Sequence, residues 1–311
     1  MRHGARRGRR EQCVPIADGD EPVRQTNYEL RDGDIMTLPI LSRPVTATLG
    51  LLVAFAPATT AQPLDALTAS LILERALDRS TNQQESGIEL EFEYLFESLV
   101  ESLDGDGLVT DTETVRYRRY PVEGYLYDEI VLRDGQPLDD DDVREEREKK
   151  AEFAEEARAH TARGERYDPE EMNIQFDHEL MDRYDTTLEG SETVRGHVCW
   201  VLSFAPRDGQ LPDNRRIDKA LNRSTGQLWI AKDDYGVVRI TFEMQEPFRY
   251  LWGLVATLRR ATGQLNLERA EPGLWTPLTF DLNMDLRVFF KGIRRHILQE
   301  WLEHTRLGTT S

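Results

Sequence analysis

Two alternating runs on either side of a tight turn constrain this fold more than any other feature of the chain. Residues 226–244 read GQLWIAKDDYGVVRITFEM, with a turn at residues 233–236. After the turn every second side chain is apolar: Val238, Ile240, Phe242 and Met244. A period of two on both sides of a glycine-containing turn is typical of an antiparallel hairpin with one buried face. The chain is therefore expected to fold around a half-buried antiparallel sheet.

Other runs along the chain predict further strands and a few helices. The strand-like runs are 88–102, 112–120, 125–133, 186–194, 197–204, 263–269 and 275–289. Residues 248–258 fit a strand or a short helix, and residues 293–306 fit a strand or an amphipathic helix. Apolar side chains at helical spacing predict helices at 64–78, 176–184 and 216–222, with a loop at 81–87. The pattern predicts a mainly β (α+β) fold: a strongly curved antiparallel sheet, or incomplete β-barrel, with a few helices packed on one face.

A charged segment interrupts the strands near residues 138–163. Four acids, Asp139 to Asp142, precede the sequence VREEREKKAEFAEEARAH. Acidic side chains at a helix start cap its free N–H groups and complement its dipole. The segment predicts an inserted, largely solvated helix.

The front of the chain has the pattern of a secretory signal peptide. Residues 45–58 form a mostly apolar run that is shorter than the roughly twenty residues needed to span a bilayer, and Thr59-Thr60-Ala61 supply small residues before a cleavage point. We expect a signal peptide from Met36 to Ala61 with cleavage before Gln62, and an uncleaved anchor is the alternative. Residues 1–35 then form a non-native or disordered extension, and residues 62–311 form a single periplasmic or secreted domain that is not an integral membrane protein.

The charge balance limits the partners of the chain. It has 57 acidic and 39 basic side chains, a net charge of −18. Taken as a whole, such a surface repels nucleic acid and anionic lipid headgroups. An acidic, lysine-poor composition suits a halophilic habitat, where salt relieves self-repulsion. A genome that favours arginine codons explains the lysine deficit but not the excess of acids.

Cysteine usage and acidic clusters give no sign of a cofactor or metal. Cys13 lies in the expected extension, so Cys199 is the only cysteine of the expected mature chain and no internal disulfide forms. Cys199 fits a packed small hydrophobe, and a reactive thiol is the alternative. Residues 104–107, DGDG, begin like a calcium loop, but Leu108 and Val115 stand where later ligands are needed. We expect a hairpin turn there.

No catalytic constellation is recognisable. The sequence contains no HExxH motif, no paired cysteines and no phosphate-binding loop. The best acid candidates are Asp281 with Asp285, and His178 beside its acidic neighbours Asp177 and Glu179. Acids on an alternating strand are typical of a solvated face. The chain is therefore expected to be non-enzymatic.

Several segments together resemble a known family. They are LDGDGLVTDTETVRYRRYPVEGYLYDEIVLRDGQPL, TLEGSETVRGHVCWVLSFAP, GQLWIAKDDYGVVRITFEM and LERAEPGLWTPLTF, and they follow a signal peptide, a leading helix and a long strand. Over about residues 88–290 the chain resembles secreted bacterial proteins related to the outer-membrane lipoprotein-sorting (LolA/LolB-like) fold. The resemblance implies an incomplete antiparallel barrel around an apolar cavity, with helices as a lid. In the carrier members this cavity holds the acyl chains of lipoproteins.

The expected function is inferred from the apolar faces of the strands. Large apolar side chains are more numerous than one curved sheet needs, and those expected to line the cavity are Phe92, Tyr94, Ile240, Phe242, Met244, Phe280, Leu282 and Met284. We expect a soluble periplasmic binding protein for an apolar or acylated ligand, such as a lipid or an acylated protein. The alternative is that helices fill this face, and that the protein is an extracytoplasmic interaction or envelope-sensing module working through its surface.

Overall fold

The computed structural model describes residues 68–165, 167, 174–215, 217–250, 256–289 and 291–308. The expected extension and signal peptide, with its cleavage site, lie outside the described residues.

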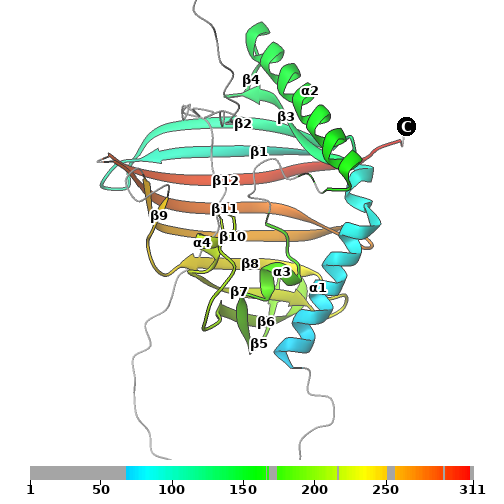
Figure 1. Ribbon diagram of the computed structural model, residues 1–311, viewed down its shortest axis with the longest axis vertical. Coiled ribbons are helices and arrows are strands. Elements are labelled where there is room, and N and C mark those ends of the chain that lie inside the picture. Colours follow the sequence, from blue (N-terminus) through cyan, green and yellow to red (C-terminus); the bar gives the residue numbers. More distant parts are fainter. Residues whose placement is uncertain are drawn as a thin grey trace, which may run out of the picture. The chain divides into compact units, whose positions relative to one another are not determined.

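A single antiparallel sheet dominates the structure (Figure 1). Its strands are β1 (Phe92–Leu103), β2 (Val109–Val122), β3 (Tyr125–Arg133), β4 (Gln136–Pro137), β5 (Tyr184–Val194), β6 (His197–Pro206), β7 (Ser224–Ala231), β8 (Val237–Met244), β9 (Phe248–Tyr250), β10 (Ala256–Glu271), β11 (Leu274–Val288) and β12 (Lys291–Arg306). The order is β4-β3-β2-β1-β12-β11-β10-β8-β7-β6-β5, and β9 pairs with β10. Because β4 and β5 are the two edges of this order, the sheet does not close. The expectation of a mainly β, incomplete barrel is confirmed.

Tight turns join the predicted hairpins. The β3–β4 turn at Asp134 and Gly135 has φ angles of 49° and 70°, and the β5–β6 turn at Arg195 and Gly196 has 52° and 86°. Two successive residues with positive φ are the signature of the two-residue turn whose twist matches that of the strands. The run at 293–306, which also fitted a helix, is strand β12.

The helices differ from expectation in their bounds, and the helix expected at 176–184 is shorter, because Tyr184 already belongs to β5. They are α1 (Ala69–Ser86), the 3-10 turn η1 (Ile88–Glu91), α2 (Asp140–Arg163), α3 (His178–Met181) and α4 (Asp218–Leu221). The loop expected at 81–87 is wrong, because α1 continues to Ser86 and ends at Gly87 with a φ of 65°. The strand expected from Ile88 is also four residues too long, because η1 occupies its start. The inserted charged helix is confirmed as α2, which Asp139 caps.

One side of the sheet, here named the first face, carries most of the large apolar side chains. Two rows of directly paired residues cross it from β6 to β1. One row is Leu202, Leu228, Ile240, Leu265, Phe280, Gln299 and Ser98; the next is Phe204, Gly226, Phe242, Gly263, Leu282, Ile297 and Val100. Gly226 is required, because a Cβ there would meet the ring of Phe204. The second row has no polar side chain across all seven strands, whereas the first is apolar from β6 to β11 and ends in Gln299 and Ser98.

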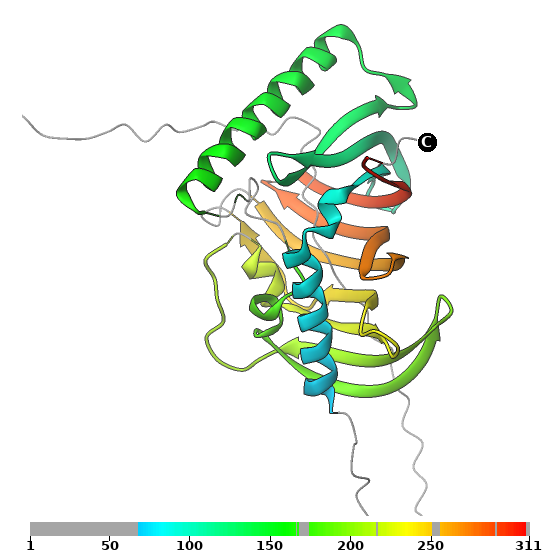
Figure 2. The same cartoon turned by 90° about the vertical axis from the view of Figure 1, so that its right-hand side faces the viewer.

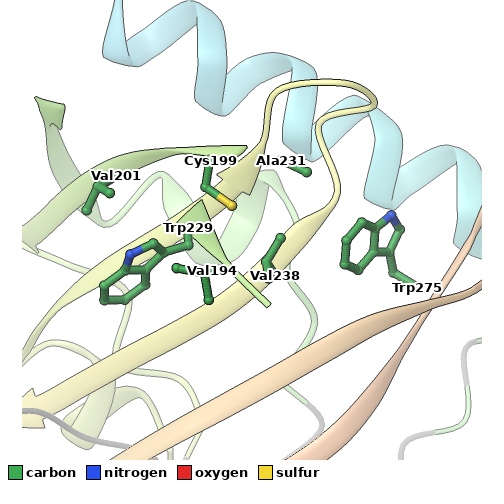
Figure 3. Packing of buried hydrophobic residues seen from close by; sticks show 7 residues of the cluster. All are labelled: Val194, Cys199, Val201, Trp229, Ala231, Val238 and Trp275. Atoms are coloured by element: carbon green, nitrogen blue, oxygen red, sulfur yellow. The ribbon is translucent and has the colours of Figure 1, made fainter. Parts of the chain in front are cut away.

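The opposite side, the second face, buries a smaller cluster. Its members are Val194, Cys199, Val201, Trp229, Ala231, Val238 and Trp275 (Figure 3). Trp275 also connects this cluster to α1, since the side-chain amide of Gln83 donates to the Trp275 carbonyl at 2.9 Å and accepts from its backbone N–H at 2.9 Å. These bonds explain why the polar residues at the end of α1 are helical.

Three helices pack against the sheet, α1 across the ends of the strands and α3 and α4 beside the β5–β8 half, and we name them together the cover (Figures 1 and 2). Arg75 of α1 donates to the hydroxyl of Tyr235, whose ring stacks on Trp200 at 5.2 Å. His178 of α3 lies 3.7 Å from Asp78 of α1. In α4 the carbonyl of Ala220 accepts from the Ser224 hydroxyl of β7 at 2.8 Å. The cover is thus tied to the sheet mainly at the β5–β8 half.

Candidate functional site

The residues expected to line an apolar cavity lie on β1, β8 and β11. Phe92, Tyr94, Phe242, Met244, Phe280, Leu282 and Met284 are buried, and Ile240 is partly buried. Phe280 keeps 9% of its surface exposed and Leu282 none. The protein itself therefore covers this surface in the present structure.

These residues form two groups rather than one. The larger group lies on β8 and β11, where Phe242 and Leu282 both pair with Gly263 of the intervening strand β10. The rings of Phe242 and Phe280 stack with their centres 6.5 Å apart. Phe92 and Tyr94 belong to a separate cluster, packed with Leu274 and with the partly buried Ile88, Ala270 and Trp301. The site candidate is the larger group.

Other strands extend the site beyond the residues expected from the sequence. Leu202, Phe204 and Leu228 continue the rows on one flank, and Ile297 and Val100 continue them on the other. Ile297 was overlooked because its segment fitted a helix as well as a strand. The rows join strands far apart in the chain, so local alternation could show that each residue faces inward but not which residues meet.

A charged side chain adjoins the apolar group. Arg295 pairs with Met284 across β11 and β12, and so shares the first face. Its Nε is buried without a hydrogen-bond partner, and among the described residues no carboxylate forms an ion pair with it. Arg119, on the same face, instead lies 2.6 Å from Asp128. Arg295 thus offers a guanidinium to an anionic group.

A buried ion cluster fastens the cover. Arg183, immediately before β5, is 1% exposed and lies 3.2 Å from the Asp218 carboxylate of α4. It also donates to Asn222 at 3.0 Å, while Arg215 approaches the same carboxylate at 3.2 Å. Burial raises the pKa of Asp218, but the backbone N–H of Arg215 and the charges of Arg183 and Arg215 outweigh it, so the pKa is lowered. The cluster holds α4 against β5.

The acids considered for catalysis are held by cations or solvated. Asp285 lies 3.9 Å from Arg259 and 3.5 Å from Arg294. Asp281 lies 3.2 Å from His296 Nε2, and the other ring nitrogen lies 2.9 Å from Glu101. His178 is 54% exposed and lies 3.7 Å from Asp78 of α1. Sequence reasoning missed the His296 contacts because the three residues come from three strands.

The chemistry of the described residues offers no activated nucleophile or metal cluster. Cys199 has no exposed surface, and burial raises the pKa of its thiol. Within the described ranges, no group of three or more His, Cys, Asp or Glu side chains could hold a metal ion. None of the helices in that part of the chain has the length and apolar character needed to cross a bilayer.

No family model and no curated protein matches the sequence. Solved structures do match, at low identity. A DUF1329 family protein from Desulfovibrio piger is 13% identical, with 77% of this chain and 95% of that one covered and a TM-score of 0.27. An outer membrane lipoprotein-sorting protein domain from Vibrio parahaemolyticus is 9% identical, with 77% and 95% covered and a TM-score of 0.30. A LolA superfamily protein from Nitrosomonas europaea is 11% identical, with 79% and 96% covered and a TM-score of 0.30. The expected likeness to lipoprotein-sorting proteins is found, as a likeness of fold.

Proposed function

We propose that the first face binds the acyl chain of a lipid or of an acylated protein, and that the ligand displaces the cover. The observation that carries this proposal is the extent of the apolar surface. It crosses seven strands, whereas two of the three helices of the cover, α3 and α4, are single turns of four residues. Such short helices are not stable without tertiary contacts, and α4 keeps its place on the sheet through the buried Arg183–Asp218 pair.

The free-energy cost of opening α1 and the free-energy gain from burying an acyl chain are of similar size. Opening α1 exposes Ile72, Leu73 and Leu77, which are buried on one side of the helix. Exposing three large aliphatic side chains costs about 5–9 kcal/mol. A buried acyl chain of about fourteen CH2 groups contributes about 11 kcal/mol, before the cost of association. By this comparison a long acyl chain offsets the opening of α1, and a short one does not.

Arg295 supports the polar end of such a ligand. An acyl chain lying along Met284 and Leu282 brings its headgroup near this guanidinium. A carboxylate or phosphate would supply the partner that Arg295 lacks among the described residues.

The cellular location of the protein is part of the proposal. We infer export by the signal peptide Met36–Ala61, cleavage before Gln62, and action in the periplasm or outside the cell as a single, non-enzymatic domain of residues 62–311. Residues 1–35 are then absent from the working protein. An acidic surface suits such a compartment at high salt.

Native mass spectrometry of the exported protein tests both the proposed export with cleavage and the proposed binding of an acyl chain. We expect a mass that begins at Gln62, with adducts of acyl-containing molecules that organic extraction removes. A mass that corresponds to a chain beginning at Met1 would contradict the proposed export and cleavage alone. Protein that carries no adduct, and gains none when palmitate is added, would contradict the binding function.

A second function is favoured by the burial of the first face. If the helices simply complete an ordinary core, the chain is an interaction or sensing module that acts through its outer surface. The two functions differ in what happens when the cover is weakened, because only a ligand site becomes easier to occupy.

A further inference from the structure

Exposed apolar side chains gather at one end of the sheet. Leu108 is 67% exposed, Val109 50% and Phe289 61%, and these three are the most exposed large hydrophobic residues of the described chain apart from Val198. Leu108 and Val109 lie at the β1–β2 turn, and Phe289 lies at the β11–β12 turn. Both turns are at the left end of the sheet in Figure 1. We name these three residues the tip surface.

Hydrogen bonds hold the two turns together. Arg294, near the start of β12, donates to the carbonyl of Asp104 at 3.3 Å and to that of Gly105 at 2.6 Å. The Asp104 carboxylate accepts from the backbone N–H of Asp106 and of Leu108, each at 2.9 Å. The tip surface is therefore presented by an ordered scaffold, and its exposure is a property of the fold.

The surroundings of Phe289 are basic, although the chain as a whole is acidic. Residues 286–295 read LRVFFKGIRR and contain four cations and no acid. Arg287 and Lys291 are exposed on either side of Phe289. The nearby Asp285 is shared by Arg259 and Arg294. The neighbouring β1–β2 turn and the start of β2 instead carry Asp104, Asp106 and Asp111, so the basic part of the tip surface is the β11–β12 turn around Phe289.

We propose that the tip surface docks on an anionic lipid bilayer. Apolar side chains at the ends of separate turns can each enter the headgroup layer, and the flanking cations are attracted to the negative surface. The cations Arg287 and Lys291 of the β11–β12 turn complement such a membrane, whereas the net charge of −18 opposes contact through other parts of the chain. The inference goes beyond ligand binding at the first face and does not depend on it.

Vesicle sedimentation tests this inference with the intact chain. We expect binding to phosphatidylcholine vesicles that contain phosphatidylglycerol, weak binding to phosphatidylcholine alone, and release by salt. Phe289→Ser and, separately, Lys291→Glu should each lower the partition coefficient about tenfold. Val198→Ser, at a site that is 54% exposed, is the matched apolar control. Arg144→Glu, where the side chain is 66% exposed, is the matched charge control. Both controls should bind as the parent does.

Three outcomes would overturn the proposal. They are no binding to either vesicle, equal binding to both, and equal losses in the tip variants and the controls. Sedimentation velocity without vesicles identifies a competing occupant: if Phe289→Ser abolishes self-association and leaves vesicle binding unchanged, the tip surface contacts a second copy of the chain.

Discussion

Asp218→Ala is expected to lower the free energy of unfolding by about 3–5 kcal/mol, because it removes the carboxylate from a buried ion pair. Arg183 would remain 1% exposed with Asn222 as its remaining hydrogen-bond partner. Its Nε already lacks a hydrogen-bond partner, and its Nη2 would lose the Asp218 carboxylate that lies 3.2 Å away. Urea unfolding followed by circular dichroism measures the loss. Because the pair fastens α4 to β5, the variant should also open the cover more often.

The control for this prediction is Asp185→Ala. Asp185 is 78% exposed and lies 3.3 Å from Arg207, so its loss should cost less than about 1 kcal/mol. The contribution of Asp218 should also depend on pH. The lowered pKa of Asp218 means that its contribution to stability is complete above the ordinary aspartate pKa of about 4 and is lost as the pH falls through the folded-state value. Equal costs for the two variants would contradict the importance of the buried pair.

Ile72→Ala is expected to make the protein less stable and yet a tighter binder. Ile72 has no exposed surface and lies on the buried side of α1. Its truncation should cost about 2–5 kcal/mol of stability. If the ligand displaces α1, the same loss reduces the cost of opening, so the dissociation constant for palmitate should fall at least about tenfold. Isothermal titration calorimetry at a temperature where both proteins are folded measures it.

Val238→Ala separates this effect from general destabilisation. Val238 is also fully buried, but it belongs to the cluster on the second face. Its truncation should lower stability and leave palmitate affinity unchanged. A weaker or unchanged affinity in Ile72→Ala would show that α1 is part of a permanent core, and would favour the interaction-module function.

The strands were predictable because most of them have one wet and one dry face. In β1, for example, buried and partly buried side chains alternate from Phe92 to Leu99, as the sequence indicates. The end of α1 was not predictable. Its last residues are polar and have no helical periodicity, and they are helical because Gln83 reaches the backbone of Trp275, 192 residues away.

The sequence predicted which side chains of the candidate site face inward, but not which of them lie next to one another. Alternation showed that Phe92 and Phe280 both point inward. In the folded sheet β12 lies between β1 and β11, so Phe92 and Phe280 are on strands that do not pair. This order of strands cannot be derived from local alternation. Arg183 follows α3 and Asp218 begins α4, and the helical pattern predicted at 176–184 and 216–222 does not indicate that these two residues pair. Their pairing depends on the three-dimensional placement of the two segments, so no local sequence pattern indicates it.

The dependence of affinity on acyl chain length tests the central claim most directly. Titration of octanoate, laurate, palmitate and stearate should show no measurable binding for octanoate. Beyond the length that offsets opening of the cover, the dissociation constant should fall about fourfold for each added CH2. Phe280→Ala should weaken palmitate binding, whereas Trp229→Ala, on the second face, should not. No binding at any length, or an affinity that does not change with length, would contradict the claim that the first face holds an acyl chain.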